Sequence, residues 1–256
     1  MKCNIKSVFS FFISSYLFII VSLSLIAFSA CSKDEEKTTP SSTQDSESSE
    51  SSGDGTQQYN AGKAVDLGLS VKWADMNVGA SKPEDYGDYF AWGETKPKTT
   101  YNWSTYKWCE GSDDTMTKYC TNSSRGTVDD KTVLELSDDA ARANWGGSWR
   151  MPTYAELNEL KTKCTFTWTT QNGVEGVLVT GPNGNRIFLP ATGVCYDGFY
   201  DVGFHGRYWS SKLHTGSSEC ACFIRFDFDY GTDRGVYYNM DFETRDGGRS
   251  VRPVTE

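Results

Sequence analysis

The sequence predicts a single α+β domain of antiparallel strands with two short helices, and three features indicate this class. Apolar and polar residues alternate in two segments near the C-terminus, 222–229 and 236–243. Such alternation is typical of antiparallel strands with one apolar face and one wetted face. Asn172-Gly173 predicts a β-hairpin. Two short stretches with helix-capping residues lie between the β segments.

The first 30 residues are typical of a secretory signal peptide. Lys2 and Lys6 precede an apolar run from Val8 to Ala30, and Cys31 follows two small residues. This order predicts export, with residues 1–30 as the signal. The 23-residue apolar run is also long enough to span a bilayer as an uncleaved anchor. In both cases the two lysines stay inside and the remainder lies outside the cytoplasm.

Residues 31–58 are expected to form a disordered tether. Residues 32–58 contain no aliphatic or aromatic side chain and carry seven acidic residues against two lysines. Such a segment cannot bury enough apolar surface to offset the entropy of ordering. One globular domain remains over 59–256, with all eight tryptophans and a formal charge of about −6. No basic patch stands out, so nucleic acid is not an expected partner.

The first half of the domain combines short strands with a long polar excursion. Strand-like segments are Ala64–Leu67, Ser70–Ala74 and Tyr86–Gly93, while the polar segment 96–130 is expected to form loops. A helix is predicted over Ala140–Asn144, because capping residues precede it and Gly146-Gly147 follows it.

A second helix is predicted from a capping box. Thr153 and Glu156 have the Thr-x-x-Glu spacing and follow Pro152, which cannot lie deep in a helix. Leu157 and Leu160 then share one face of the helix.

The second half of the domain is expected to be β again. Alternation begins at Phe166 and Trp168, and further strands are predicted at 176–180, 186–190 and 250–254. In the two alternating segments, one face is expected to be apolar and the other wetted. The expected apolar residues are Cys222, Ile224, Phe226, Phe228, Val236, Tyr238, Met240 and Phe242.

Five ordered blocks resemble the Fibrobacter succinogenes major paralogous domain family. They are Ala64–Gly79, Tyr89–Glu94, Gly146–Leu157, Tyr208–Ser211 and Ser250–Val254. The resemblance implies a C-type-lectin-like fold, shared with formylglycine-generating enzymes. It implies that Arg150-Met151-Pro152-Thr153 starts the second helix and that the C-terminal strand returns beside the first. The motifs identify a fold and do not identify a site.

The residues around Cys31 resemble the lipobox of bacterial lipoproteins, although Phe28 stands where that motif usually has a leucine-like residue. The resemblance implies that Cys31 is acylated and anchors the protein to a membrane. Lys33-Asp34-Glu35-Glu36 resembles the surface-export signal of Bacteroidetes lipoproteins. It implies an outer-membrane protein exposed at the cell surface, with an ordinary periplasmic tether as the alternative.

Six cysteines remain in the domain, and in an oxidising compartment they could form three disulfides. Cys109 and Cys120 enclose a polar loop and are the favoured local pair. Cys220 and Cys222 lie too far apart along a strand to bond to each other. The remaining two are Cys164 and Cys195.

Catalysis has little support in the sequence. The two histidines, His205 and His214, lie in a loop-like region without an Asp or Ser at motif spacing. Cys220-Ala221-Cys222 departs from the redox pair of the formylglycine-generating relatives, and the triplets of calcium-dependent lectins are missing. No cofactor is therefore expected. The alternative is calcium at four carboxylates that a solvated sheet face explains as well, Asp227, Asp229, Asp241 and Glu243.

Aromatic residues in loops favour a binding function, because sugar rings pack their C–H faces on exposed Trp and Tyr rings. The predicted ligand-binding residues are Trp103, Trp108, Tyr200 and Tyr208. The alternative is that these rings pin long loops to the core. We therefore expect a non-enzymatic surface module for an extracellular glycan or protein ligand. The alternatives are an accessory component of a surface assembly, such as a fimbrial tip, and a formylglycine-generating-type enzyme.

Overall fold

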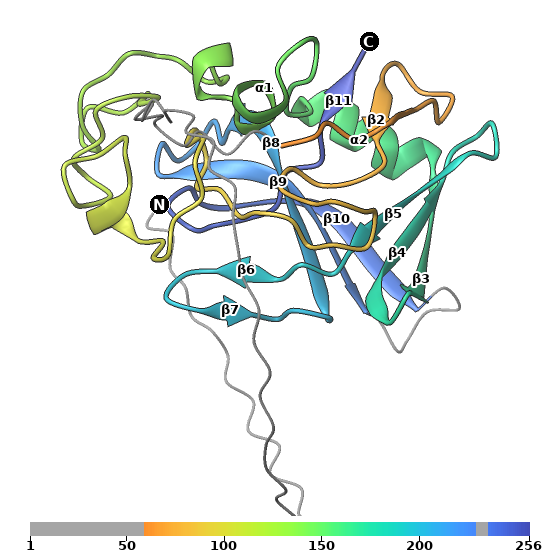
Figure 1. The fold of residues 1–256 in the computed structure, drawn as a ribbon. Coiled ribbons are helices and arrows are strands. Elements are labelled where there is room, and N and C mark those ends of the chain that lie inside the picture. Colours follow the sequence, from red (N-terminus) through yellow and green to blue (C-terminus); the bar gives the residue numbers. More distant parts are fainter. Residues whose placement is uncertain (1–58, 229–234) are drawn as a thin grey trace, which may run out of the picture. The chain divides into compact units, whose positions relative to one another are not determined.

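A computed structural model describes residues 59–228 and 235–256, which lie in one compact unit, Asp54–Glu256. The predicted signal peptide (1–30), the tether (31–58) with Cys31, and Asp229 lie outside the described residues. The described part is an α+β fold of antiparallel sheets with two α-helices, as the sequence predicted (Figure 1).

The elements follow one another in short pieces. The strands are β1 (Ala64–Val65), β2 (Lys72–Ala74), β3 (Thr165–Gln171), β4 (Val174–Thr180), β5 (Arg186–Pro190), β6 (Val194–Cys195), β7 (Phe199–Tyr200), β8 (His205–Leu213), β9 (Cys220–Phe228), β10 (Val236–Thr244) and β11 (Val254–Thr255). The helices are α1 (Ala140–Trp145) and α2 (Tyr154–Lys163), with 3-10 turns η1 (Trp103–Thr105) and η2 (Leu136–Asp138).

The strands form four antiparallel groups. β9 is the middle strand of the sheet β10–β9–β8, and β4 is the middle strand of β3–β4–β5. β2 lies between β1 and β11, while β6 and β7 form a separate hairpin, drawn below the long sheet in Figure 1. The predicted hairpin at Asn172-Gly173 joins β3 to β4, with the positive φ angles that this turn needs at both residues.

Both predicted helices are present, and their caps explain where they begin. Thr153 Oγ1 accepts a hydrogen bond from Glu156 N at 3.2 Å, and the Glu156 carboxylate accepts one from Thr153 N at 2.8 Å. Arg150 holds the same carboxylate with two hydrogen bonds, at 2.8 and 2.6 Å. Asp139 caps α1, which ends one residue later than predicted, before Gly146.

The sheet β10–β9–β8 separates two apolar cores. The sequence predicted that one of its faces would be wetted, and this prediction is wrong for the part of that face that the second core covers. Ile224 and Phe226 of β9 face the first core, where Leu157 of α2 packs. Ala221 and Phe223 point to the opposite side and are also buried, in the second core. Only the far end of that face carries charge. The alternation in the sequence could not show that half of the polar face is covered by other segments.

The C-terminal segment, 245–255, is buried throughout but is a strand only at β11. β11 pairs with β2, which also pairs with β1, so the C-terminal strand shares a sheet with the first strand but is not its direct neighbour. The predicted strand Tyr86–Gly93 is absent. Its backbone makes only an isolated bridge to the C-terminal segment, at Phe90 and Arg249, and not a continuous ladder. Phe90 exchanges backbone hydrogen bonds with Arg249, and Trp92 N donates to Arg245 O. The predicted excursion, 96–130, consists of loops apart from η1.

Replacing Thr153 with Ala should cost about 1 kcal/mol of unfolding free energy, because Glu156 N loses its capping acceptor. Thr162→Ala is the matched control, since this exposed hydroxyl bonds back to Asn158 O and Glu159 O in the same helix. Urea unfolding of both variants measures the difference. Equal stability of the two variants would contradict the capping role.

Replacing Arg252 with Lys should cost about 3 kcal/mol or more. The buried guanidinium donates to Asn77 Oδ1 at 2.8 Å, Ala74 O at 3.1 Å and Phe188 O at 2.9 Å, and one ammonium cannot reach all three. The exposed Arg186→Lys change should shift stability by less than about 0.5 kcal/mol. Thermal or urea melts test this. A loss of stability in Arg252→Lys no larger than that in Arg186→Lys would show that the three hydrogen bonds of Arg252 are not needed.

Candidate functional site

The four aromatic residues predicted to bind a ligand do not form one surface. Trp103 lies in η1, half-buried, with its ring edge-on to Tyr106 at 5.6 Å. Trp108 is also half-buried. Its Nε1 donates to Gly93 O at 2.8 Å, and Lys107 Nζ lies 4.1 Å from its ring centre. Trp108 therefore helps to hold the long excursion to the core.

Tyr208 is a core residue, which corrects its assignment to a ligand surface. Its side chain is 1% exposed, and its hydroxyl donates to Pro190 O at 2.7 Å. Tyr208 is buried because it lies on the apolar face of β8, directly opposite Ile224 of β9. Tyr200, in contrast, is 48% exposed and remains available for binding.

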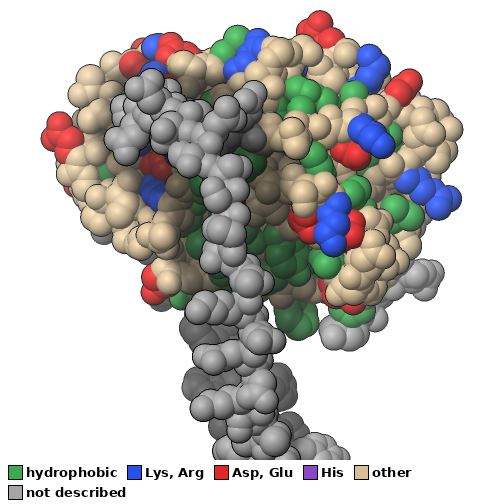
Figure 2. All heavy atoms as spheres, in the orientation of Figure 1, with side chains coloured by type: hydrophobic (Ala, Val, Ile, Leu, Met, Phe, Trp, Pro, Cys, Tyr) green, Lys and Arg blue, Asp and Glu red, His purple; other side chains and the backbone are tan. Residues whose placement is uncertain are grey.

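The β6–β7 hairpin presents the exposed part of the predicted aromatic site. Phe199 is 66% exposed, and Tyr200 follows it directly. Phe204, which the sequence placed in the same loop, is 62% exposed. Figure 2 shows hydrophobic side chains at the surface along the lower edge of the domain, beside these strands. Three large exposed rings thus fall within six residues of the chain, which makes this segment a candidate for a ligand surface.

The hairpin is firmly mounted even though its rings are exposed. Cys195 exchanges two backbone hydrogen bonds with Gly248, each 2.9 Å, and Tyr101 N donates to Tyr196 O at 2.8 Å. Gly193 has a φ of 64°, and a Cβ there would approach Tyr200 O to 2.0 Å, so only glycine fits. A fixed backbone presents the rings without an ordering cost on binding.

Charged side chains cover the open end of the β8–β9–β10 face. We call the set the charged ladder: His205, Arg207, Arg225, Asp227, Asp241 and Glu243. Arg225 links Asp227 at 2.5 Å to Asp241 at 3.3 Å, and His205 Nδ1 lies 2.5 Å from Asp227 Oδ1. His205 is the first residue of β8 and not a loop residue, and the strand register brings it opposite Asp227.

The charged ladder borders the hairpin. Arg207 reaches Asp201, just after β7, at 3.5 Å and Glu243 on β10 at 3.5 Å. Tyr196 of the hairpin turn is half-buried, and burial raises the pKa of its hydroxyl, while Arg249 acts against this rise. Rings and hydrogen-bonding groups therefore lie side by side on this part of the domain.

The carboxylates of the ladder are neutralised by cationic side chains. Burial by itself raises the pKa of Asp227, but hydrogen bonds from His205 and Arg225 bring it below its ordinary value. Burial likewise raises the pKa of Glu243, and attraction to Arg249 and Arg207 outweighs it.

Calcium prefers several carboxylates free to act as ligands, whereas these carboxylates already contact arginine. Three of the four predicted carboxylates, Asp227, Asp241 and Glu243, lie on adjacent strands, and Asp229 lies outside the described residues. Within 59–228 and 235–256, no group of three His, Cys, Asp or Glu side chains is placed to hold a metal ion.

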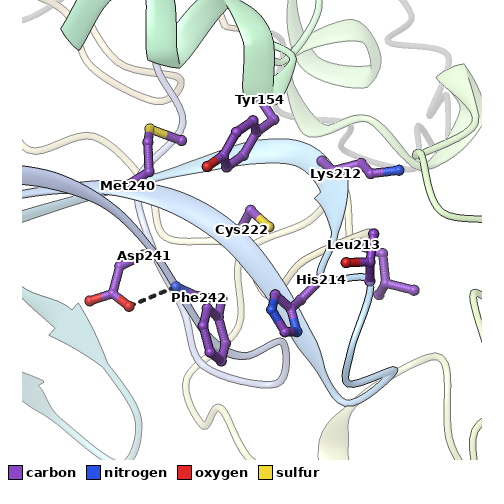
Figure 3. Close-up of a pocket in the computed structure, with 9 residues that line it drawn as sticks. Tyr154, Lys212, Leu213, His214, Cys222, Met240, Asp241 and Phe242 are labelled. Atoms are coloured by element: carbon purple, nitrogen blue, oxygen red, sulfur yellow. Dashed lines mark hydrogen bonds between the residues drawn. The ribbon is translucent and has the colours of Figure 1, made fainter. Parts of the chain in front are cut away.

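A hollow of about 440 Å³ is lined by His214 and Cys222, among other residues (Figure 3). The Cys222 thiol points into the space between Tyr154 and His214, while the His214 ring stacks on Phe242 at 3.8 Å. Burial raises the pKa of the Cys222 thiol and lowers that of His214. The net rise in the thiol pKa opposes an activated thiolate, although the charge of Lys212 acts in the other direction.

The favoured disulfide is not formed. Cys109 Sγ donates to Trp103 O at 3.1 Å, and Cys120 Sγ donates to Asn122 O at 3.2 Å, so each thiol contacts a backbone carbonyl in its own loop. The free thiols include Cys109, Cys120, Cys164, Cys195 and Cys222. The polar loop between Cys109 and Cys120 suggested that a disulfide closes it. Backbone hydrogen bonds hold the loop instead, and Cys120 N donates to the Asp129 carboxylate.

No family model, curated protein or solved structure matches the chain. Among helices in the described part, none has the length and apolar character needed to cross a bilayer.

Asp227→Asn should lower the unfolding free energy at pH 7 by about 2 kcal/mol, because His205 and Arg225 lose a charged acceptor. The folded-state pKa of Asp227 lies below its unfolded value. The stabilisation is therefore present above the unfolded pKa, near 4, and is lost as the pH falls through the folded pKa.

The stability difference between wild type and Asp227→Asn should consequently shrink between pH 5 and pH 2. Urea melts across this range measure it, and the exposed Asp114→Asn variant serves as the control for removing one carboxylate. A difference that stays constant with pH would refute the ion-pair assignment.

Proposed function

We propose that the protein is a non-enzymatic surface lipoprotein whose domain binds an extracellular glycan or protein ligand. The observation that carries this proposal is the β6–β7 hairpin, whose exposed Phe199 and Tyr200 rings stand on a fixed backbone beside the charged ladder. In this proposal Cys31 carries the lipid and residues 31–58 link the domain to the outer membrane.

The surface suits a ligand with both apolar and hydroxyl-bearing faces. Phe199 and Tyr200 offer apolar area, with the Tyr200 hydroxyl oriented by Asp197 at 2.5 Å. Arg207 and Arg225 of the ladder supply donors, and their carboxylate partners supply acceptors. A sugar ring or a protein loop could be recognised this way without a bridging metal.

We also propose the C-type-lectin-like fold and membership in the major paralogous domain family. Two structural features support this proposal. Arg150-Met151-Pro152-Thr153 leads into α2, and the C-terminal β11 pairs beside the N-terminal strands.

The double variant Phe199→Ala/Tyr200→Ala should weaken binding at least about tenfold in a glycan-array and mucin-binding screen, because two exposed anchor rings are lost. Its melting temperature should fall only slightly, since Phe199 is 66% and Tyr200 48% exposed. Phe242→Ala, a 43% exposed ring at the Figure 3 hollow, is the matched control and should bind normally.

EDTA should not alter this binding. If EDTA abolishes binding while the double variant binds normally, the assignment of the hairpin as the binding surface is wrong. The carboxylates Asp227, Asp229, Asp241 and Glu243 would then become the site to test.

Cys31→Ala should release the protein from the membrane fraction, because the acyl chains that anchor it are attached to this thiol. Cell fractionation and immunoblotting measure the change, with Cys109→Ala as the control for losing a cysteine. Unchanged membrane association of Cys31→Ala would favour the uncleaved transmembrane anchor instead.

A further inference from the structure

An aromatic pocket of about 580 Å³ is lined by neither of the hairpin rings Phe199 and Tyr200. Its lining comes from three parts of the chain that are distant in sequence. We call the set the aromatic pocket: Trp168 of β3, Glu175 of β4, Gly203 and Phe204 before β8, and Phe228 at the end of β9.

Contacts among the lining residues fix the walls. The Trp168 and Phe228 rings meet edge-on, with centres 5.2 Å apart. Phe228 N donates to Phe204 O at 3.2 Å, so the third ring is tied to the second through the backbone. Phe204 itself is 62% exposed, which leaves its ring free to contact a ligand.

Glu175 gives the pocket a fixed negative charge. Its carboxylate accepts hydrogen bonds from Trp168 Nε1 at 2.7 Å and Thr170 Oγ1 at 2.6 Å, one on each oxygen. Both partners are neutral, and no described Lys, Arg or His lies within ion-pair distance. The ladder carboxylates Asp227 and Glu243 each have cationic partners, so Glu175 differs from them.

We infer that the aromatic pocket binds the cationic end of a small alkylated ammonium ligand of the choline type. Ring faces carry negative electrostatic potential and attract an ammonium whose alkyl groups also pack on them. Glu175 supplies the counter-charge. A neutral apolar ligand would remove water from this carboxylate without supplying a counter-charge, which is costly. The pocket lacks the several oxygen ligands that a metal ion needs.

Calorimetric titration of the purified protein with choline chloride tests the inference. Its uncharged isostere, 3,3-dimethylbutan-1-ol, has the same shape without the charge. Choline should bind saturably, and the isostere should bind at least about tenfold more weakly. Equal binding of both compounds, or no binding of choline, would overturn the inference.

Variants locate the binding. Glu175→Gln keeps an acceptor for Trp168 and should weaken choline binding about tenfold, whereas the exposed Glu110→Gln should not change it. Phe204→Ala should weaken it as well. Normal choline binding by both pocket variants would disprove the assignment. Melting temperatures close to wild type show that the variants are folded.

This inference does not depend on the hairpin surface. The Phe199→Ala/Tyr200→Ala variant should bind choline as the wild type does, while Glu175→Gln should keep glycan or mucin binding. Loss of choline binding in the hairpin variant alone would contradict the pocket. Failure of the glycan and mucin screen would leave the choline result intact.

Discussion

The buried C-terminal segment is the constraint on which the rest of this domain depends. Arg245, Arg249 and Arg252 are at most 1% exposed, and they are satisfied largely by backbone carbonyls and aromatic faces. Arg245 donates to Tyr119 O and Lys118 O, each at 2.8 Å, and so fixes the long excursion. Burial lowers the pKa of Arg252 to about 10, a cost that only full hydrogen bonding offsets. A segment with little regular structure can therefore join three parts of the domain.

The same segment mounts the proposed binding surface. Gly248 fixes the hairpin through Cys195, while Arg249 lies 4.2 Å from the Trp209 ring centre and pairs with Glu243 of the ladder. Main-chain hydrogen bonds hold the hairpin in place while its Phe199 and Tyr200 rings stay exposed. In this region main-chain atoms provide the stability, while the exposed ring atoms are proposed to bind the ligand. Truncating the rings should therefore leave folding almost intact.

Charge is distributed unevenly between the two sites. In the ladder, arginines neutralise the carboxylates, so the surface offers hydrogen bonds more than net charge. In the aromatic pocket, the partners of Glu175 among the described residues are neutral, and we propose that its charge serves a ligand. The sequence could not show this difference, because several of the partners come from other strands: Arg207 of β8 reaches Glu243, and Trp168 of β3 reaches Glu175. His205 beside Asp227 is a further case, since 22 residues separate them in the chain.

The sequence by itself determined the features that depend on near neighbours. Capping at Thr153, the Asn172-Gly173 turn, both α-helices and the last long strands follow from side chains within a few residues of one another. Tertiary structure decided what depends on distant segments: Tyr208 is buried and Tyr200 exposed although both lie in one aromatic stretch. It also decided that Ala221 and Phe223 face a second core. Burial is a property of what packs above a residue, and local periodicity carries no record of it.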